Sequence, residues 1–199
     1  MYISKISKGK LAGQIDLRRS PEYVRGVKNI VTKEFEIIKN QFIRNFNNHK
    51  VTREIEAGPD SRNISGTLGG YGNLFSYIGF SKGDKPIEPI RSLFKDIRIN
   101  SININKFGQS STFIAYPRAQ DIFAVTPLPW ADSRSWAEGI ERGLPGLGYF
   151  LSKDNIGRSG AGIQVEKQVK QTKFQNVKYI SSLINEFEKD ILSLNNKTF

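Results

Sequence analysis

The 199-residue sequence contains no cysteine, and its only histidine is His49. The absence of cysteine excludes disulfide bonds, thiolate zinc sites, iron–sulfur clusters and cysteine nucleophiles. A single histidine also excludes any metal site within one chain that needs two imidazole ligands. We therefore expect a protein that is not an enzyme, and we assign no catalytic, metal-binding or cofactor-binding residue and no cofactor.

Long apolar runs are also missing, since no stretch approaches the roughly 18 residues needed to cross a membrane. The opening residues, Met1–Lys5, lead into no apolar segment of the kind found in a secretory signal. We therefore expect a protein that is made in the cytoplasm and does not contact a membrane.

Acidic residues are too few to balance the basic ones. Lysine and arginine number 30 against 19 aspartate and glutamate residues, which gives a net charge of +11. A positive field of this size favours an anionic partner, either DNA or an acidic protein surface. A basic nucleic-acid-binding protein is thus one hypothesis, although the sequence has no recognisable zinc finger or helix-turn-helix.

A helix start signal lies at Ser20-Pro21-Glu22, with a hydroxyl cap, proline in the first turn and an acidic group after it. Apolar residues then recur every three or four positions, which predicts an amphipathic helix over 21–47. The residues of this apolar face are Val27, Val31, Phe35, Ile38, Phe42 and Phe46. Residues 1–19 are predicted to form an arm or an edge strand, and 20–199 a single α+β domain.

Downstream of the helix, Val51 and Ile55 predict one or two further helical turns, and five glycines predict a loop over 58–72. Isoleucines alternate over 97–104 with a change of phase at Asn100-Ser101, which predicts either a β-bulge or a tight turn between two strand pieces. The remaining predicted elements are strands over 73–80, 112–116, 121–126 and from Ile163, and helices over 86–96, from Asp132 or Ser133 to Gly143, and over 178–194.

This order of elements, with mostly short connections, predicts an α+β fold. An antiparallel sheet would be packed by the long N-terminal amphipathic helix and by the C-terminal helix.

Three candidates for chemistry have ordinary structural explanations. Gly157–Ala161 nearly matches a nucleophile elbow, but alanine replaces its last glycine. Glu138 and Glu141 share a helical face near Arg142, which favours a salt bridge or an interface over catalysis. His49 follows the end of the long helix, where we expect a capping or surface role. These patterns favour a structural protein.

Two short motifs resemble those of a family of tailed-bacteriophage neck proteins, the tail-completion or minor tail proteins of lambda-like phages. The first is a [Ser/Thr]-Gly-x-Leu motif after a long helix, matched by Ser65-Gly66-Thr67-Leu68. The second is an aromatic-Ala-x-x-[Val/Ile]-Glu-x-Gly motif, matched by Trp136–Gly143. A closing helix, here 178–194, completes the resemblance. The insertion over 73–97 departs from the pattern, as does the lack of an Arg-Pro-aromatic segment before the last helix.

The resemblance implies a non-enzymatic structural protein of the virion, made in the host cytoplasm. It would form a homo-oligomeric ring, with a hexamer as the expected form, at the phage neck or tail end, where it serves in head–tail connection or tail completion. Its partners would be further copies and other neck and tail proteins, with DNA contacted or passed through the ring. The motif residues that we expect at the interface are Ser65, Gly66, Leu68, Trp136 and Glu141.

Overall fold

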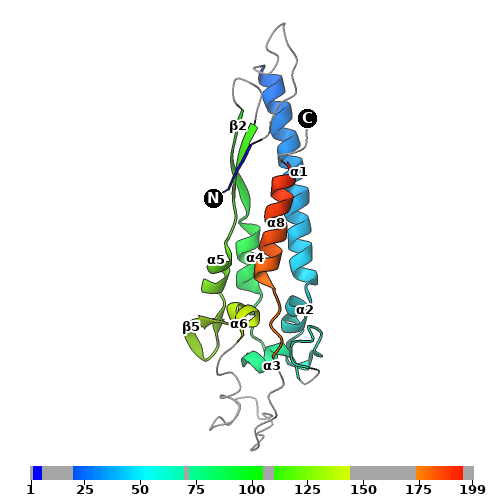
Figure 1. The fold of residues 1–199 in the computed structure, drawn as a ribbon, viewed down its shortest axis with the longest axis vertical. Helices are drawn as coiled ribbons and strands as arrows, with labels where there is room; N and C mark the ends of the chain where they lie inside the picture. The colour runs from blue at the N-terminus through cyan, green and yellow to red at the C-terminus, as the bar shows by residue number, and fades with distance from the viewer. Residues whose placement is uncertain (1, 6–19, 70–71, 105–109, 144–173, 195–199) are drawn as a thin grey trace, which may run out of the picture. The chain divides into compact units, whose positions relative to one another are not determined.

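The computed structural model describes residues 2–5, 20–69, 72–104, 110–143 and 174–194 (Figure 1). These residues form an α+β fold with a long N-terminal helix, a C-terminal helix and two antiparallel sheets, as the sequence predicted. The helices are α1 (Pro21–Asn48), α2 (Lys50–Glu56), η2 (Gly58–Asp60), α3 (Leu74–Ile78), α4 (Glu88–Lys95), α5 (Ala119–Ala124), α6 (Trp136–Arg142) and α8 (Ile180–Leu194). The strands are β1 (Tyr2–Lys5), β2 (Arg98–Ile104), β3 (Ser110–Ala115), β4 (Pro127–Leu128) and β5 (Ala131–Ser135).

The chain divides into two compact units. Unit 1 takes in Met1–Asn45, Phe94–Pro117 and Leu183–Phe199, and unit 2 takes in Phe46–Leu93 and Arg118–Ser182. Each unit is described separately below. The predicted boundary between an arm and a single domain at residue 20 stays a prediction.

Helix α1 begins where its sequence signal placed it, because the Ser20 hydroxyl accepts a hydrogen bond of 3.1 Å from the Tyr23 amide. On its predicted apolar face, Val31, Phe35, Phe42 and Phe46 are buried, while Val27 and Ile38 are partly exposed. Two other apolar side chains lie outside that face: Ile30 is 39% exposed and Ile37 is 59% exposed. The helix therefore has a buried apolar stripe and a second, solvent-facing apolar strip.

Aromatic rings form the centre of unit 1. The Phe42 ring lies 4.6 Å from that of Phe94 and 4.6 Å from that of Phe187 in α8. Tyr116, which follows β3, packs edge-on against Phe187 at 5.7 Å. These contacts join α1, α8, the end of α4 and the chain leaving the sheet around one apolar core.

The sheet of unit 1 has the strand order β1-β3-β2, with both pairings antiparallel. Ile99 lies opposite Ile114 and Ser101 lies opposite Phe113, so Asn100 is an extra residue in β2. Because strand side chains alternate between faces, this bulge puts Ile99, Ile102 and Ile104 on the same face as the buried Ile114. The predicted change of phase is thus confirmed as a β-bulge.

Unit 2 consists of short elements, and two of its helices were predicted as strands. Asn73–Phe80 is not a strand, because its central residues form α3. The Asn73 side chain caps that helix by accepting from the Ser76 amide at 2.9 Å, and Gly79 ends it with a φ of 96°. Residues 121–126 likewise belong mainly to α5, where the Asp121 carboxylate accepts from the Arg118 amide at 2.7 Å. Apolar runs this short do not distinguish the period of a helix from that of a strand.

The helix predicted from Asp132 or Ser133 starts later, because both residues lie in strand β5. Ser135 is the N-cap of α6, and its hydroxyl accepts from the Glu138 amide at 3.0 Å. Gly143, with a φ of 92°, ends the helix as predicted. The glycine-rich segment over 152–162, including Gly157–Ala161, and the strand predicted from Ile163 lie outside the described residues.

Candidate functional site

The two motifs of the resemblance both lie in unit 2, and both bond to the same irregular segment, residues 174–179. From this segment the Gln175 amide donates to the carbonyl of Thr67 at 3.0 Å, and the Val177 amide donates to the carbonyl of Ile140 at 3.2 Å. Thr67 belongs to the first motif and Ile140 to the second. One segment without regular secondary structure therefore connects the two motifs through its backbone and then continues into α8.

A buried carboxylate fixes the loop that carries the first motif. Glu54 is fully buried on α2, where its two oxygens accept from the amides of Ser65 at 2.6 Å and Leu74 at 2.8 Å. The Asn73 side-chain amide donates to the carbonyls of Pro59 at 2.8 Å and Ser61 at 3.1 Å. The chain's own side chains thus hold the loop that follows α2 at several points.

The second motif is the helix α6. Its Trp136 side chain is only 1% exposed, and the ring packs edge-on against Phe80 at 6.0 Å. On the outer side, Glu138 forms the predicted salt bridge with Arg142 at 2.5 Å. Glu141 is partly exposed, and its carboxylate accepts from the Ser181 amide at 2.6 Å, in the first turn of α8. The placement of this carboxylate suits the positive end of the α8 dipole.

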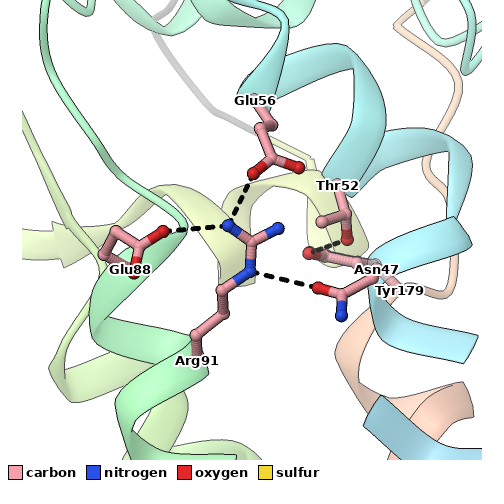
Figure 2. Close-up of polar contacts among 6 residues, drawn as sticks. All are labelled: Asn47, Thr52, Glu56, Glu88, Arg91 and Tyr179. Atoms are coloured by element: carbon pink, nitrogen blue, oxygen red, sulfur yellow. Dashed lines mark hydrogen bonds and ion pairs between the residues drawn. The ribbon is translucent and has the colours of Figure 1, made fainter. Parts of the chain in front are cut away.

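A cluster of polar contacts lies where α2 meets α4 (Figure 2). The Arg91 guanidinium bonds to the carboxylates of Glu56 at 2.5 Å and Glu88 at 2.9 Å, and to the Asn47 amide oxygen at 3.1 Å. The hydrogen bond that Arg91 donates to Glu56 is the largest of the effects that raise the pKa of Arg91 further above its usual value. Arg91 is therefore a permanent cation that ties three elements together.

Beside this cluster, the Tyr179 hydroxyl pairs with that of Thr52 at 2.7 Å, and both side chains are fully buried (Figure 2). Burial raises the pKa of Tyr179 well above its usual value, so the phenol stays protonated. Its ring stacks at 6.1 Å against that of Phe46. Tyr179 thus anchors the segment over 174–179 immediately before α8.

His49 has a capping role, as expected, but at a different helix end. Its Nδ1 accepts from the Val51 amide at 3.3 Å, which caps the start of α2 rather than the end of α1. The ring lies 4.8 Å from that of Tyr179. Burial, and secondarily Lys50, lower the pKa of His49 below its usual value. A neutral imidazole fits these contacts, because Nδ1 must be unprotonated to accept the hydrogen bond.

The five residues expected at an interface are all in unit 2, but they differ in exposure. Leu68 and Trp136 are buried within the chain, Ser65 and Glu141 are partly exposed, and Gly66 is exposed. The interface role of all five stays a prediction. In the part of the chain that the structure describes, no group of three or more histidine, aspartate or glutamate side chains is arranged to hold a metal ion.

Sequence reasoning missed the residues that organise this region, namely Glu54, Asn73, Arg91 and Tyr179. A signal existed for Glu54, which lies between Val51 and Ile55 on the apolar side of a short helix. A signal also existed for Asn73, since asparagine before an apolar run and glycine after it, here Gly79, bracket a helix. The contacts of Arg91 with Glu56 and Asn47 gave no signal, because these partners are distant in sequence. The same is true of Tyr179 and Thr52.

Comparisons with protein-family models, curated proteins and solved structures found no match to this chain. None of the helices among the described residues has the length and apolarity needed to cross a membrane.

Proposed function

We propose that the chain is a non-enzymatic structural protein of a phage virion, which assembles as a homo-oligomeric ring at the neck or tail end. The observation that carries the proposal is the connection between the three parts of the family resemblance. Residues 174–179 bond to Thr67 of the first motif and to Ile140 of the second, and lead into the closing helix α8. Three separate sequence signals are thus joined by one segment of the chain, which supports the resemblance.

The polar groups of this element are engaged in contacts that maintain the fold. Glu54 holds two backbone amides, Glu141 meets the start of α8, and Thr52 pairs with Tyr179. Groups used in this way stabilise a framework, which suits a subunit whose function is contact with neighbours.

We assign the second, solvent-facing apolar strip of α1 to contact with a second copy. Ile30 and Ile37 lie seven residues apart and so share one side of the helix, both with exposed side chains. Lys33 and Arg44 flank them and are also exposed. An apolar centre with charged neighbours is the usual composition of a protein interface.

The test is the mass of the purified chain, measured by light scattering over a range of concentrations at low and high salt. The proposal expects a discrete oligomer that forms without DNA. Ile37→Glu should reduce the oligomer strongly, because it puts a charge in an apolar contact. Thr32→Glu adds the same charge at an exposed position about 140° around the same helix from Ile37, and it should leave assembly nearly unchanged. A monomer at every concentration, or equal effects of both variants, would contradict the proposal.

Nucleic-acid binding, which the net charge of +11 suggests, is tested by adding DNA to the same samples. A DNA-binding protein loses affinity linearly in the logarithm of salt concentration, with a slope set by the phosphates contacted. If the affinity for DNA falls steeply with salt and the chain stays monomeric, the second hypothesis is favoured. Salt-resistant assembly would favour the first.

A further inference from the structure

A groove with a volume of about 810 Å³ runs along strand β2 in unit 1. Every residue from Arg98 to Asn103 lines it. Side chains of a strand alternate between its two faces, so six consecutive residues can line one groove only if it follows the edge of the strand. The groove therefore exposes the backbone edge of β2.

This edge has no neighbouring strand among the described residues, because the sheet order β1-β3-β2 places β2 at its border. An edge strand directs alternate N–H and C=O groups away from its sheet, and these groups can pair with a further extended chain. The opposite wall of the groove comes from α1, through Lys28, Thr32, Glu36 and Lys39, which lie on one side of that helix. The groove thus combines a strand edge with a charged helix wall.

Basic groups predominate in the lining. Lys28, Lys95 and Arg98 line the groove on different elements, and all three side chains are exposed. Lys39 is already engaged, since its ammonium group donates to the carbonyls of Lys95 at 2.9 Å and Ile97 at 2.6 Å. The acidic side chains of the lining are Glu36 and Asp96. The remaining excess of positive charge complements an acidic ligand.

We propose that this groove binds an extended acidic segment of a partner protein, which adds to β2 as a further antiparallel or parallel strand. The backbone groups of the β2 edge would supply general affinity, as in other cases of strand addition. Lys28, Lys95 and Arg98 would select acidic side chains on the added strand. The proposal rests on the groove alone and is independent of the proposed virion role.

Nucleic acid fits the same groove less well for two reasons. Glu36 and Asp96 would lie close to a continuous row of phosphates, whereas a peptide can place its acidic side chains away from them. The β2 edge also presents carbonyl acceptors beside its N–H donors, and phosphate groups have no proton to donate to them. A peptide backbone carries both donors and acceptors, and so it matches the edge.

The test uses the isotope-labelled chain and follows backbone amide signals by NMR as a peptide is added. The probe is a blocked peptide of alternating valine and glutamate, about eight residues long, which is enough to cover a typical strand. One control peptide replaces glutamate with lysine. A second control keeps the glutamates but carries N-methyl groups on alternate amides, which prevents pairing with a strand edge. An oligothymidylate is the nucleic-acid probe.

We expect the valine–glutamate peptide to shift the amides of Arg98–Asn103 and to bind about tenfold or more tightly than either control peptide. The double variant Lys28→Glu/Arg98→Glu should weaken this binding by about tenfold or more and should favour the lysine peptide instead. Lys189→Glu is the matched variant, since Lys189 is exposed on α8 in the same unit but does not line the groove. It should change the affinity by less than about twofold.

Several outcomes would overturn the proposal. Equal binding of the N-methylated peptide would mean that charge acts without strand pairing. Tighter binding of the oligothymidylate at the same amides would assign the groove to nucleic acid. Shifts of the Arg98–Asn103 amides with protein concentration alone would assign it to a second copy, and the absence of binding by all three peptides would show that the edge is not a docking site. Thermal unfolding of each variant verifies that the fold is retained.

Discussion

Unit 1 and unit 2 are stabilised by different kinds of contact. Unit 1 has long regular elements around aromatic rings in edge-on and tilted contact, with Phe42 against both Phe94 and Phe187. Unit 2 has short elements joined by side chains that bond to backbone groups. Of the eight buried polar side chains among the described residues, six belong to unit 2: Thr52, Glu54, Thr67, Asn73, Thr126 and Ser135.

Because of this difference, we expect the two units to be destabilised by different kinds of mutation. In unit 1 the free energy of unfolding should follow the apolar volume that is removed, because a cavity costs both transfer energy and contacts. In unit 2 it should follow the number of buried donors and acceptors left without a partner. Substitutions in each unit test this contrast.

Phe42→Ala should lower the free energy of unfolding by about 3–5 kcal/mol, since the ring is buried between two others. Urea unfolding followed by circular dichroism measures this loss. Ile37→Ala is the control on the same helix, and its 59% exposure predicts a change within about 0.5 kcal/mol. A loss below about 1 kcal/mol for Phe42→Ala would show that the aromatic contacts do not form the core of unit 1.

Glu54→Ala should cost about 1–3 kcal/mol for each of the two amides that lose their acceptor, those of Ser65 and Leu74. Glu54→Gln should restore only part of this loss, because the amide group offers one acceptor oxygen in place of two. Faster hydrogen exchange at both amides should accompany the change.

Glu56→Ala is the control for Glu54, since it lies on the same short helix but is exposed and joined to Arg91 by a surface salt bridge. Such bridges contribute about 0–1 kcal/mol. If both glutamate variants lost the same stability, burial of the Glu54 carboxylate would have no special role in unit 2.

Thr52→Val and Tyr179→Phe should each cost about 1–3 kcal/mol, because each leaves one buried hydroxyl without its partner. The double variant should cost less than the sum, since it removes both polar groups together. A double-mutant cycle from urea unfolding measures this coupling. Strict additivity would mean that the hydroxyl pair contributes nothing specific.

The contrast between the units also explains how far the sequence could predict the fold. In unit 1 the helix over 21–47, the C-terminal helix and the bulge at Asn100 followed from the spacing of apolar residues, and all three are confirmed. Long elements repeat their period several times, so the pattern identifies them. The α+β class was therefore predictable.

In unit 2 the same reasoning failed at 73–80 and 121–126, which were predicted as strands and contain α3 and α5. Elements of five or six residues complete too few turns for a period to be recognised, and their caps decide the conformation. Asn73 and Asp121 are such caps, and their side chains bond to backbone amides three residues away.

The candidate site was predictable only in part. The two motifs could be located from sequence, but the segment over 174–179 that joins them could not, because its bonds to Thr67 and Ile140 are between backbone groups. Backbone hydrogen bonds leave no mark on residue type. The groove along β2 was missed for the same reason, since a strand edge is a property of topology.

Glu141→Gln should lower the stability of the monomer by about 0.3–1 kcal/mol, because a carboxylate near a helix N-terminus contributes about that much. Raised salt should reduce the difference. If Glu141 also contacts a cation of a neighbouring subunit, as the resemblance implies, the variant should impair assembly by more than this monomer effect. Light scattering at two salt concentrations separates the two roles, with Glu138→Gln as the control on the same helix. Normal assembly would limit Glu141 to its contact with α8.

His49 provides the smallest test, because at neutral pH its imidazole is already in the form that caps α2. Its pKa in the folded chain lies below the usual value of 6.5, so the unfolded chain binds a proton more readily. The stabilisation is thus complete above about pH 6.5 and is lost as the pH falls through that value towards the lower folded pKa. His49→Asn keeps a capping acceptor that does not titrate, and its stability should depend less on pH between about 7.5 and 5.5. The two proteins are compared by the slope of stability against pH and not by stability itself, because asparagine cannot replace the ring contact with Tyr179. Because the chain has no other histidine, parallel slopes for the two proteins would show that the cap does not require a neutral imidazole.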